Sequence, residues 1–260
     1  SLYTQKIKMS RKKINYIKKV NIYKPEFPLW AMILFKTIFI TFIICCAVVA
    51  VFSFVYVCTP VDGPSMLPTL NAQQYDEEGN LIEGSSNDSV YINRFGAADY
   101  GDIIVAKSPL DGKYVIKRLI AKEGDKIAVV AITNEIFPAN RTYKVMLIKS
   151  GQSEVEILDE PYLEEGTSLY QTYYNFTNYR SLNPERFTQM DVGNYGQVYF
   201  LTLNDGEFFY LGDNREDSRD CAEYGPNTEN NYVGRVDIIV HESENHFSQI
   251  FLYFWHLIFG

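Results

Sequence analysis

DIIVAKSPLDGKYVIKRLIAKEGD, residues 102–125, contains two short apolar runs on either side of an Asp-Gly pair. An Asp-Gly pair between runs rich in Val and Ile is a strong hairpin signal, because the tight turn needs residues that tolerate a positive φ. Runs of similar length, separated by Gly, Asp, Asn or Pro, recur along the chain at 90–95, 127–132, 143–148, 197–203, 207–211 and 236–240. This pattern predicts a mainly β domain rather than alternating strands and helices.

One part of the chain departs from this pattern. Residues 150–195 are acidic, rich in Tyr and Asn, and weakly periodic. They predict an irregular insertion or a small subdomain, with approximate bounds 128–203. We expect the β domain as a whole to cover residues 59–246, and we see no internal repeat.

An apolar segment precedes the β domain. Residues 37–58 are 22 positions without a formal charge, and as a helix they would extend about 33 Å, enough to cross the hydrocarbon core of a bilayer. A buried core helix fits poorly, because such a helix rarely stays apolar on every face. A cleavable signal peptide fits poorly too, because the run is long and ends in bulky Tyr56 and Val57. The sequence therefore predicts a transmembrane helix within residues 29–58.

Charge is distributed unevenly around this segment. Residues 1–36 contain nine Lys or Arg and one acid, whereas the remainder contains 15 basic and 31 acidic residues. Basic residues beside a membrane helix favour the cytoplasmic side. We therefore expect a cytoplasmic basic arm at 1–28 and an acidic body outside the cytoplasm, with the lipid bilayer and no nucleic acid among the partners.

The last 14 residues, 247–260, read FSQIFLYFWHLIFG and are strongly apolar. They are too few to span a bilayer as a helix. Three interpretations stay open: a segment at the membrane surface, where Trp255 and the other aromatic rings would suit the interface, a final element packed on the body, or the start of a second span.

The cysteines and histidines give little sign of a disulfide framework or a metal site. Cys45, Cys46 and Cys58 lie in or at the edge of the apolar segment, where cysteine behaves as a small hydrophobe. Only Cys221 lies well inside the body, and all three histidines follow residue 240 without a paired spacing. We expect neither a metal nor another cofactor.

Ser65 is the first candidate for chemistry. It lies in VDGPSMLPTL, residues 61–70, between Gly63, Pro64 and Pro68. Glycine and proline on both sides fix a sharp local backbone that can present a hydroxyl in an unusual direction. An ordinary turn serine is the alternative.

A serine nucleophile needs a base, and Lys117 is the candidate. In a strand over 114–121, Lys117 has aliphatic neighbours on its own face. Burial among such neighbours lowers the pKa of a lysine, and the neutral amine can then accept the serine proton. The alternative is a lysine whose stem is buried while its ammonium group reaches water.

A third segment is EFFYLGDNREDSRDCAEYGP, residues 207–226. Its Gly-Asp-Asn run is typical of a turn. Charged side chains crowd there, and a fixed network of ion pairs can hold a loop rigid beside a site. These side chains are Asp213, Arg215, Asp217, Arg219 and Asp220.

Taken together after an apolar anchor, the three segments resemble bacterial type I signal peptidase of the single-span Gram-positive type. The resemblance covers residues from about 30 to 240, apart from most of 128–155 and 164–200. It rests on Gly63, Ser65, Met66, Pro68, Thr69 and Leu70; on Gly101-Asp102-Ile103; on Tyr114, Val115, Lys117, Arg118 and Gly124-Asp125; on Glu160-Pro161-Tyr162-Leu163; and on Gly212 to Arg215, Ser218 and Asp220.

The resemblance implies a β domain of the signal-peptidase and repressor-protease kind, with a small inserted subdomain, after one transmembrane helix. It implies a serine endopeptidase that removes signal peptides from exported preproteins at the outer face of a bacterial membrane. Ser65 would be the nucleophile and supply a backbone N–H to the oxyanion hole, Lys117 the general base, and Ser218 the group that orients the lysine amine. Structural support is implied for Arg118, Asp213, Asn214, Arg215 and Asp220, and substrate contact for Pro64 and Met66.

Two positions depart from the family pattern. Cys221-Ala222 replaces the usual Ser-Arg, so Asp220 lacks its arginine partner, and we expect Arg219 to substitute for it. Gly63 replaces a serine that assists the oxyanion hole in some members, which leaves this task to backbone N–H groups.

Rival functions stay open at the level of sequence. A triad could use Ser65 with His241 or His246 and an aspartate. A membrane-anchored protein of this fold could instead bind exported peptides without cutting them. Serine–lysine autoproteases of the repressor kind share the dyad, but they are soluble and cytoplasmic, which the apolar segment disfavours.

Overall fold

We describe the fold from a computed structural model, which covers residues 28–74, 76, 80, 82, 85–133 and 141–259. The chain divides into two compact units, residues 1–51 and 52–260. The expected basic arm, apart from Pro28, lies outside the described residues.

Helix α2, Leu29–Val55, is the one helix in the described part of the chain that is long and apolar enough to cross a membrane. None of its residues is buried by other parts of the protein. The expected span ran three residues further, to Cys58. Instead, strand β1, Tyr56–Pro60, begins directly after the helix and pairs antiparallel with β2, Ser89–Asn93.

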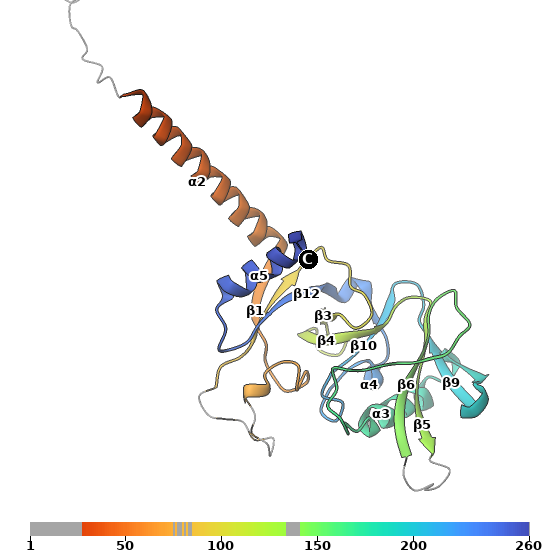
Figure 1. Ribbon diagram of the computed structural model, residues 1–260. Coiled ribbons are helices and arrows are strands. Elements are labelled where there is room, and N and C mark those ends of the chain that lie inside the picture. Colours follow the sequence, from red (N-terminus) through yellow and green to blue (C-terminus); the bar gives the residue numbers. More distant parts are fainter. Residues whose placement is uncertain are drawn as a thin grey trace, which may run out of the picture. The chain divides into compact units, whose positions relative to one another are not determined.

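The body contains two antiparallel sheets (Figure 1). The first sheet has seven strands in the order β1-β2-β12-β3-β4-β10-β11. Beyond β1 and β2, these strands are β3 (Ile103–Lys107), β4 (Tyr114–Ala121), β10 (Glu207–Leu211), β11 (Asn227–Thr228) and β12 (Tyr232–Val240). The short helices η1 (Ala72–Gln74), α4 (Cys221–Tyr224) and η4 (Glu229–Asn231) lie in its connections.

The second sheet occupies the range that was expected to be an irregular insertion or a small subdomain. Its order is β7-β6-β5-β9-β8, with β5 (Lys126–Thr133), β6 (Arg141–Ile148), β7 (Glu156–Ile157), β8 (Phe187–Asp191) and β9 (Gln197–Thr202). Helix α3 (Tyr170–Leu182) and the short helices η2 (Pro184–Arg186) and η3 (Gly193–Tyr195) complete it. The described residues of this range therefore form a β subdomain rather than an irregular insertion.

The mainly β architecture is confirmed, and so is the hairpin at Asp111-Gly112. Strands β3 and β4 pair antiparallel from Ile103 opposite Arg118 to Lys107 opposite Tyr114, and Gly112 takes a φ of 70° in the turn. Each of the eight apolar runs corresponds to one strand.

One hydrophobic core joins the two sheets. It combines Ile104 and Phe209 of the first sheet with Ile127 and Leu201 of the second. Phe176 of α3 packs into the same core, which explains why a helix of low average hydrophobicity forms there. This core fixes the strand β4 that carries Lys117.

The apolar tail forms helix α5, His246–Phe259. Its residues Ile250 and Tyr253 pack on a small cluster that contains Tyr91, Ile238 and Val240. The structure therefore supports packing on the body, one of the three open interpretations, while most of the helix surface stays exposed.

Candidate active site

The loop that carries Ser65 is held to the first sheet by its own apolar side chains. Val61, Met66 and Leu70 are buried in a cluster with Val90 and Val105 of that sheet. These buried side chains restrict the backbone conformation of the loop residues between them. Gly63 takes a φ of 87°, which favours glycine. The hydroxyl of Ser65 lies between the anchors.

The base of the loop is closed by a buried amide–carboxylate pair. Asn71, at a φ of 63°, donates its backbone N–H to Asp88 Oδ2 at 2.8 Å, and its Oδ1 accepts from the Asp88 N–H at 2.9 Å. Its Nδ2 also donates to the carbonyl of Val61 at 3.0 Å. Both side chains are fully buried, so these bonds stabilise the two ends of the loop against each other.

Strand β4 brings Lys117 to the serine. Lys117 Nζ lies 2.5 Å from Ser65 Oγ and 3.1 Å from the carbonyl oxygen of Ile116. The lysine is only 3 % exposed. Lys117 is therefore not a lysine whose stem is buried while its ammonium group reaches water. Its amine points at Ser65 inside the protein.

Burial changes the proton affinity of this amine. Desolvation lowers the pKa of Lys117 from 10.5 to about 8, against the opposing effect of the Asp220 and Asp213 charges, which raise it. The sequence reasoning anticipated the burial but not the two carboxylates, which come from the distant segment after β10.

The segment after β10 also contacts the loop of Ser65 directly. Asn214 donates its backbone N–H to the Ser65 carbonyl at 3.2 Å and its Nδ2 to the Pro64 carbonyl at 3.2 Å. At Gly212 a Cβ would overlap both the Ser65 carbonyl oxygen and Ser218 Oγ. Gly212 is thus required for the close approach of two backbones.

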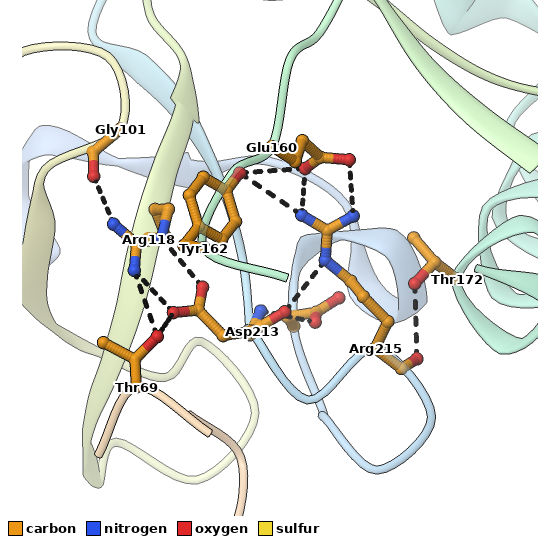
Figure 2. A network of polar contacts seen from close by, with 10 residues as sticks. Thr69, Gly101, Arg118, Glu160, Tyr162, Thr172, Asp213 and Arg215 are labelled. Carbon is orange, nitrogen blue, oxygen red and sulfur yellow. Dashed lines mark hydrogen bonds and ion pairs between the residues drawn. The ribbon is translucent and has the colours of Figure 1, made fainter. Parts of the chain in front are cut away.

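Arg118, next to the lysine on β4, ties three segments together (Figure 2). It makes a bidentate pair with buried Asp213, at 2.8 Å from Nε to Oδ1 and 2.5 Å from Nη2 to Oδ2. It also donates to the Gly101 carbonyl at 2.7 Å. Thr69, from the loop of Ser65, donates to Asp213 Oδ2 at 2.5 Å. A planar fork of this kind fixes both partners in orientation.

Arg215 forms the second half of the network. It is only 2 % exposed and pairs with Glu160 through both terminal nitrogens, while its Nε donates to the Gly212 carbonyl at 3.0 Å. Figure 2 shows the Tyr162 ring between Arg118 and Arg215. The Arg118 guanidinium carbon lies 3.8 Å from the ring centroid, and the Tyr162 hydroxyl donates to Glu160 at 2.8 Å.

The expected replacement of the missing arginine does not occur. Arg219 contacts Glu223 at 3.4 Å on the surface, not Asp220. Asp220 instead accepts backbone N–H groups from Gly212 at 3.0 Å and Ala222 at 3.1 Å, and so caps the short helix α4. Burial raises the pKa of this carboxyl group, against these hydrogen bonds and the charge of Lys117, which lower it.

Ser218 lies beside these groups but not on the lysine. Its Oγ is buried and, in the described part of the chain, makes no hydrogen bond of ordinary geometry, although it is close enough to Asp220 to favour the ionised carboxylate. The two hydrogen bonds of Lys117 Nζ go to Ser65 and Ile116. The lysine-orienting role of Ser218 therefore stays a prediction.

A cleft of about 610 Å³ opens onto Ser65 and Lys117. Most of its lining is aliphatic and comes from β1, the loop of Ser65, β2, β3, β4 and β12. Met66 lines the cleft, whereas Pro64, the other residue expected at the substrate, is not among the lining residues. An extended apolar peptide segment would suit these walls.

The histidines of the alternative triad are engaged elsewhere. His241 Nδ1 lies 2.9 Å from Asp88 Oδ2, and His246 Nδ1 lies 3.1 Å from the Tyr91 hydroxyl. Within the ranges that the structure describes, no group of three or more His, Cys, Asp or Glu side chains has an arrangement that could hold a metal ion.

Comparison with known proteins gives the family. The model of the family described as signal peptidase, peptidase S26, matches residues 34–241. The chain belongs to the S26 signal peptidase family. A curated relative, subunit 1a of the mitochondrial ATP-independent inner membrane protease of Arabidopsis thaliana, is 38% identical over 74 residues. That match covers 28% of this chain and 39% of the relative, so the chain spans well under half the length of that relative.

One solved structure is similar in part. A signal peptidase I from Enterococcus faecalis is 21% identical, with a TM-score of 0.31, and the match covers 54% of this chain and 97% of that one. The bounds of the S26 match include α2 from Leu34 onward and all strands of both sheets.

Sequence reasoning missed several residues that build this S26 site. Glu160 and Tyr162 were noted only as part of a similar segment, and Asn71 and Asp88 were not noted. A buried Arg215 requires an acid within reach, which could have drawn attention to Glu160. Asn71 and Asp88 carried no local signal, because their pairing depends on contacts made across 17 residues.

Proposed function

We propose that this protein is a serine endopeptidase that removes signal peptides from exported preproteins. Ser65 is the nucleophile and Lys117 the general base. The observation that carries the proposal is the 2.5 Å approach of Ser65 Oγ to the amine of a lysine that is 3 % exposed. The pKa of Lys117, about 8, leaves a usable fraction of its amine neutral near neutral pH.

The reaction needs only these two side chains and backbone amides. Neutral Lys117 accepts the Ser65 proton as Oγ attacks the scissile carbonyl, and the resulting ammonium group returns that proton to the departing amine. Lys117 then deprotonates a water molecule, which attacks the acyl-enzyme, and the ammonium group so formed returns the proton to Ser65 Oγ as the acyl bond breaks. In the described part of the chain the Ser65 N–H donates to no protein acceptor, so it is available to the oxyanion.

An unpaired stretch of β4 provides a place for the substrate backbone. Strand β10 pairs with β4 only from Arg118 onward, so no strand among the described residues pairs with Tyr114 to Lys117 on that side. Leu119 exchanges its hydrogen bonds with residues 101 and 102. By alternation, Tyr114 and Ile116 direct their N–H and C=O groups away from β3 and toward the cleft. A preprotein segment would add to this edge as a strand beside Ser65.

The cleft walls support the expected preference for small residues. The family resemblance implies alanine at the first and third positions before the cut. Val61, Met66 and Val105 are all buried and line the cleft. Because they pack into the core, they can make little room for a bulky substrate side chain. Small apolar side chains would fill the space without displacing them.

We further propose that the body works at the outer face of a bacterial membrane. The supports are the candidate span α2 and the charge asymmetry of the sequence, with nine Lys or Arg and one acid in residues 1–36. The anchor would keep the site near emerging substrates.

A second candidate function is peptide binding without cleavage. The observation in its favour is Cys221-Ala222 in place of the family's Ser-Arg, which leaves Asp220 without an arginine partner in the described part of the chain. The close Ser65–Lys117 pair argues against it, because a binding protein has no use for an activated hydroxyl.

Cleavage of a preprotein with an Ala-x-Ala site, in detergent, tests these alternatives. Wild type is expected to cut, and Ser65→Ala and Lys117→Met to lose cleavage at least about a thousandfold, since each removes one partner of a cooperating pair. The control is a variant in which His241 and His246 are both replaced with Gln; it should retain cleavage. Cleavage that depends on the histidines but not on Lys117 would establish the triad instead, and a folded wild type that binds but cuts no preprotein would favour peptide binding.

A further inference from the structure

Helix α5 has two apolar faces, and only one of them is covered by protein. Its inner face packs through Ile250 and Tyr253 on the first sheet. Its outer face carries Phe247, Phe251 and Trp255, which are 77 %, 54 % and 50 % exposed. A surface helix of a soluble domain ordinarily carries charged residues on its outer face, whereas α5 has no Lys, Arg, Asp or Glu.

The exposed residues follow one stripe along the helix. Phe247, Phe251, Trp255 and Phe259 are spaced four residues apart and therefore lie on one side. The rings of the last three lie close to one another: the centroids of Phe251 and Trp255 are 6.0 Å apart, and those of Trp255 and Phe259 are 4.5 Å apart. We call these four residues the aromatic stripe. Its size and continuity exceed the scattered apolar residues found on most protein surfaces.

Contacts within the body tie α5 to the end of the candidate membrane span. Phe52 lies in the last turn of α2, and its ring lies 6.1 Å from that of Phe254 on α5. Tyr56, which follows α2, shares a hydrogen bond to Asp237 with Tyr253. If α2 crosses a bilayer, residues 52–56 lie at its boundary with water, so α5 is held at the same level.

From these contacts we propose that α5 lies in the membrane interface, with the aromatic stripe inserted among the lipid acyl chains near the headgroups. Aromatic rings on an uncharged helix are the side chains that this region of a bilayer favours. With no Lys or Arg on the helix, the association is hydrophobic and does not need anionic lipid. The second contact with the bilayer restricts rotation of the body about its anchor.

This inference uses the membrane anchor but not the proposed catalysis, so the two fail separately. Each can be tested on this same 260-residue chain, one by lipid contact and the other by cleavage.

Tryptophan fluorescence tests the proposal directly, because the chain has two tryptophans, Trp30 and Trp255. The Trp30→Phe variant, reconstituted in phosphatidylcholine vesicles, reports on Trp255 alone. We expect blue-shifted emission, strong quenching by brominated phosphatidylcholine, and several-fold weaker quenching by iodide than for an aqueous reference. That reference carries Tyr195→Trp in a Trp30→Phe, Trp255→Phe background, since Tyr195 is 42 % exposed in the β8–β9 turn.

Two outcomes would overturn the proposal. In the first, iodide quenches Trp255 as strongly as the aqueous reference and brominated lipid does not quench it. This result would show that the aromatic stripe faces water. In the second, Trp255 is protected from iodide only at high protein-to-lipid ratios, and brominated lipid again does not quench it. This result would show that a second copy of the chain covers Trp255. The Trp255→Phe variant, which reports on Trp30 in α2, verifies that the lipid quencher works.

Discussion

The chemistry of a single amine, Lys117, should set how the activity depends on pH. Because desolvation lowers the pKa of Lys117 to about 8, the neutral, active fraction of the amine falls progressively as the pH drops below that value. We expect kcat/KM to fall roughly tenfold for each pH unit below about 8 and to level off above it. A profile measured on a soluble peptide substrate checks this, and an activity that is unchanged from pH 6 to 9 would contradict a lysine base.

The Asp220→Asn substitution provides a second test of the pKa of Lys117. The Asp220 charge is the first of the effects that raise the pKa of Lys117, and asparagine can still cap α4. Its removal should therefore move the acidic limb of the profile to lower pH. Glu223→Gln, a neighbouring change on the surface, is the control and should leave the limb in place. An Asp220→Asn limb that shifts upward would contradict this electrostatic account.

Gly212 is important because it has no Cβ atom. A Cβ there would overlap the Ser65 carbonyl oxygen and Ser218 Oγ. Gly212→Ala should cost about 1–3 kcal/mol in the free energy of unfolding and displace Ser65, with a large loss of activity. Gly96→Ala is the matched control, because its Cβ would meet only the side chain of Asn93, at 3.1 Å. Denaturant unfolding and peptide cleavage measure both effects, and equal behaviour of the two variants would contradict the close-packing argument.

Among the elements, the segment before α3 and the segment after β10 depend on one buried ion pair, Arg215–Glu160. Glu160→Ala leaves a buried guanidinium without its partner and should cost about 3–5 kcal/mol. Glu223→Ala removes the partner of exposed Arg219 and should cost less than about 1 kcal/mol. Thermal and denaturant unfolding of the two variants would show the difference, and similar small losses in both would mean that the Arg215 pair does not hold these segments.

The elements that local patterns specify were predictable, and those that depend on distant contacts were not. The β3–β4 hairpin follows from Asp111-Gly112 between aliphatic runs, and the strand that carries Lys117 follows with it. Helix α3 was missed because its helical periodicity is weak and it is stabilised by packing of Phe176 in the shared core. Strand β1 was absorbed into the expected span, because Tyr56–Cys58 continue the uncharged run of the helix before them.

Over the whole molecule, the sequence predicted which residues form the site, but it did not predict which charged residues pair with one another. Ser65 and Lys117 were chosen from their settings and a family resemblance, and the structure places them in contact. The partners of the charged residues were assigned incorrectly or not at all: Arg219 pairs with Glu223 rather than Asp220, and Arg215 with Glu160. Sequence places charges near one another along the chain, but ion pairs form between side chains that the fold brings together.

The half-paired strand β4 has a consequence for how catalysis ends. Residues Tyr114 to Lys117 offer one edge, which a peptide can occupy before and after the bond is cut. If, as proposed, the substrate adds to this edge as a strand, a fragment that remains there would block the next preprotein until it leaves, and its departure would limit turnover. Deuterium exchange at the Tyr114 and Ile116 amides would follow this occupancy directly: exchange is slow while a fragment stays bound and fast once the edge is vacant.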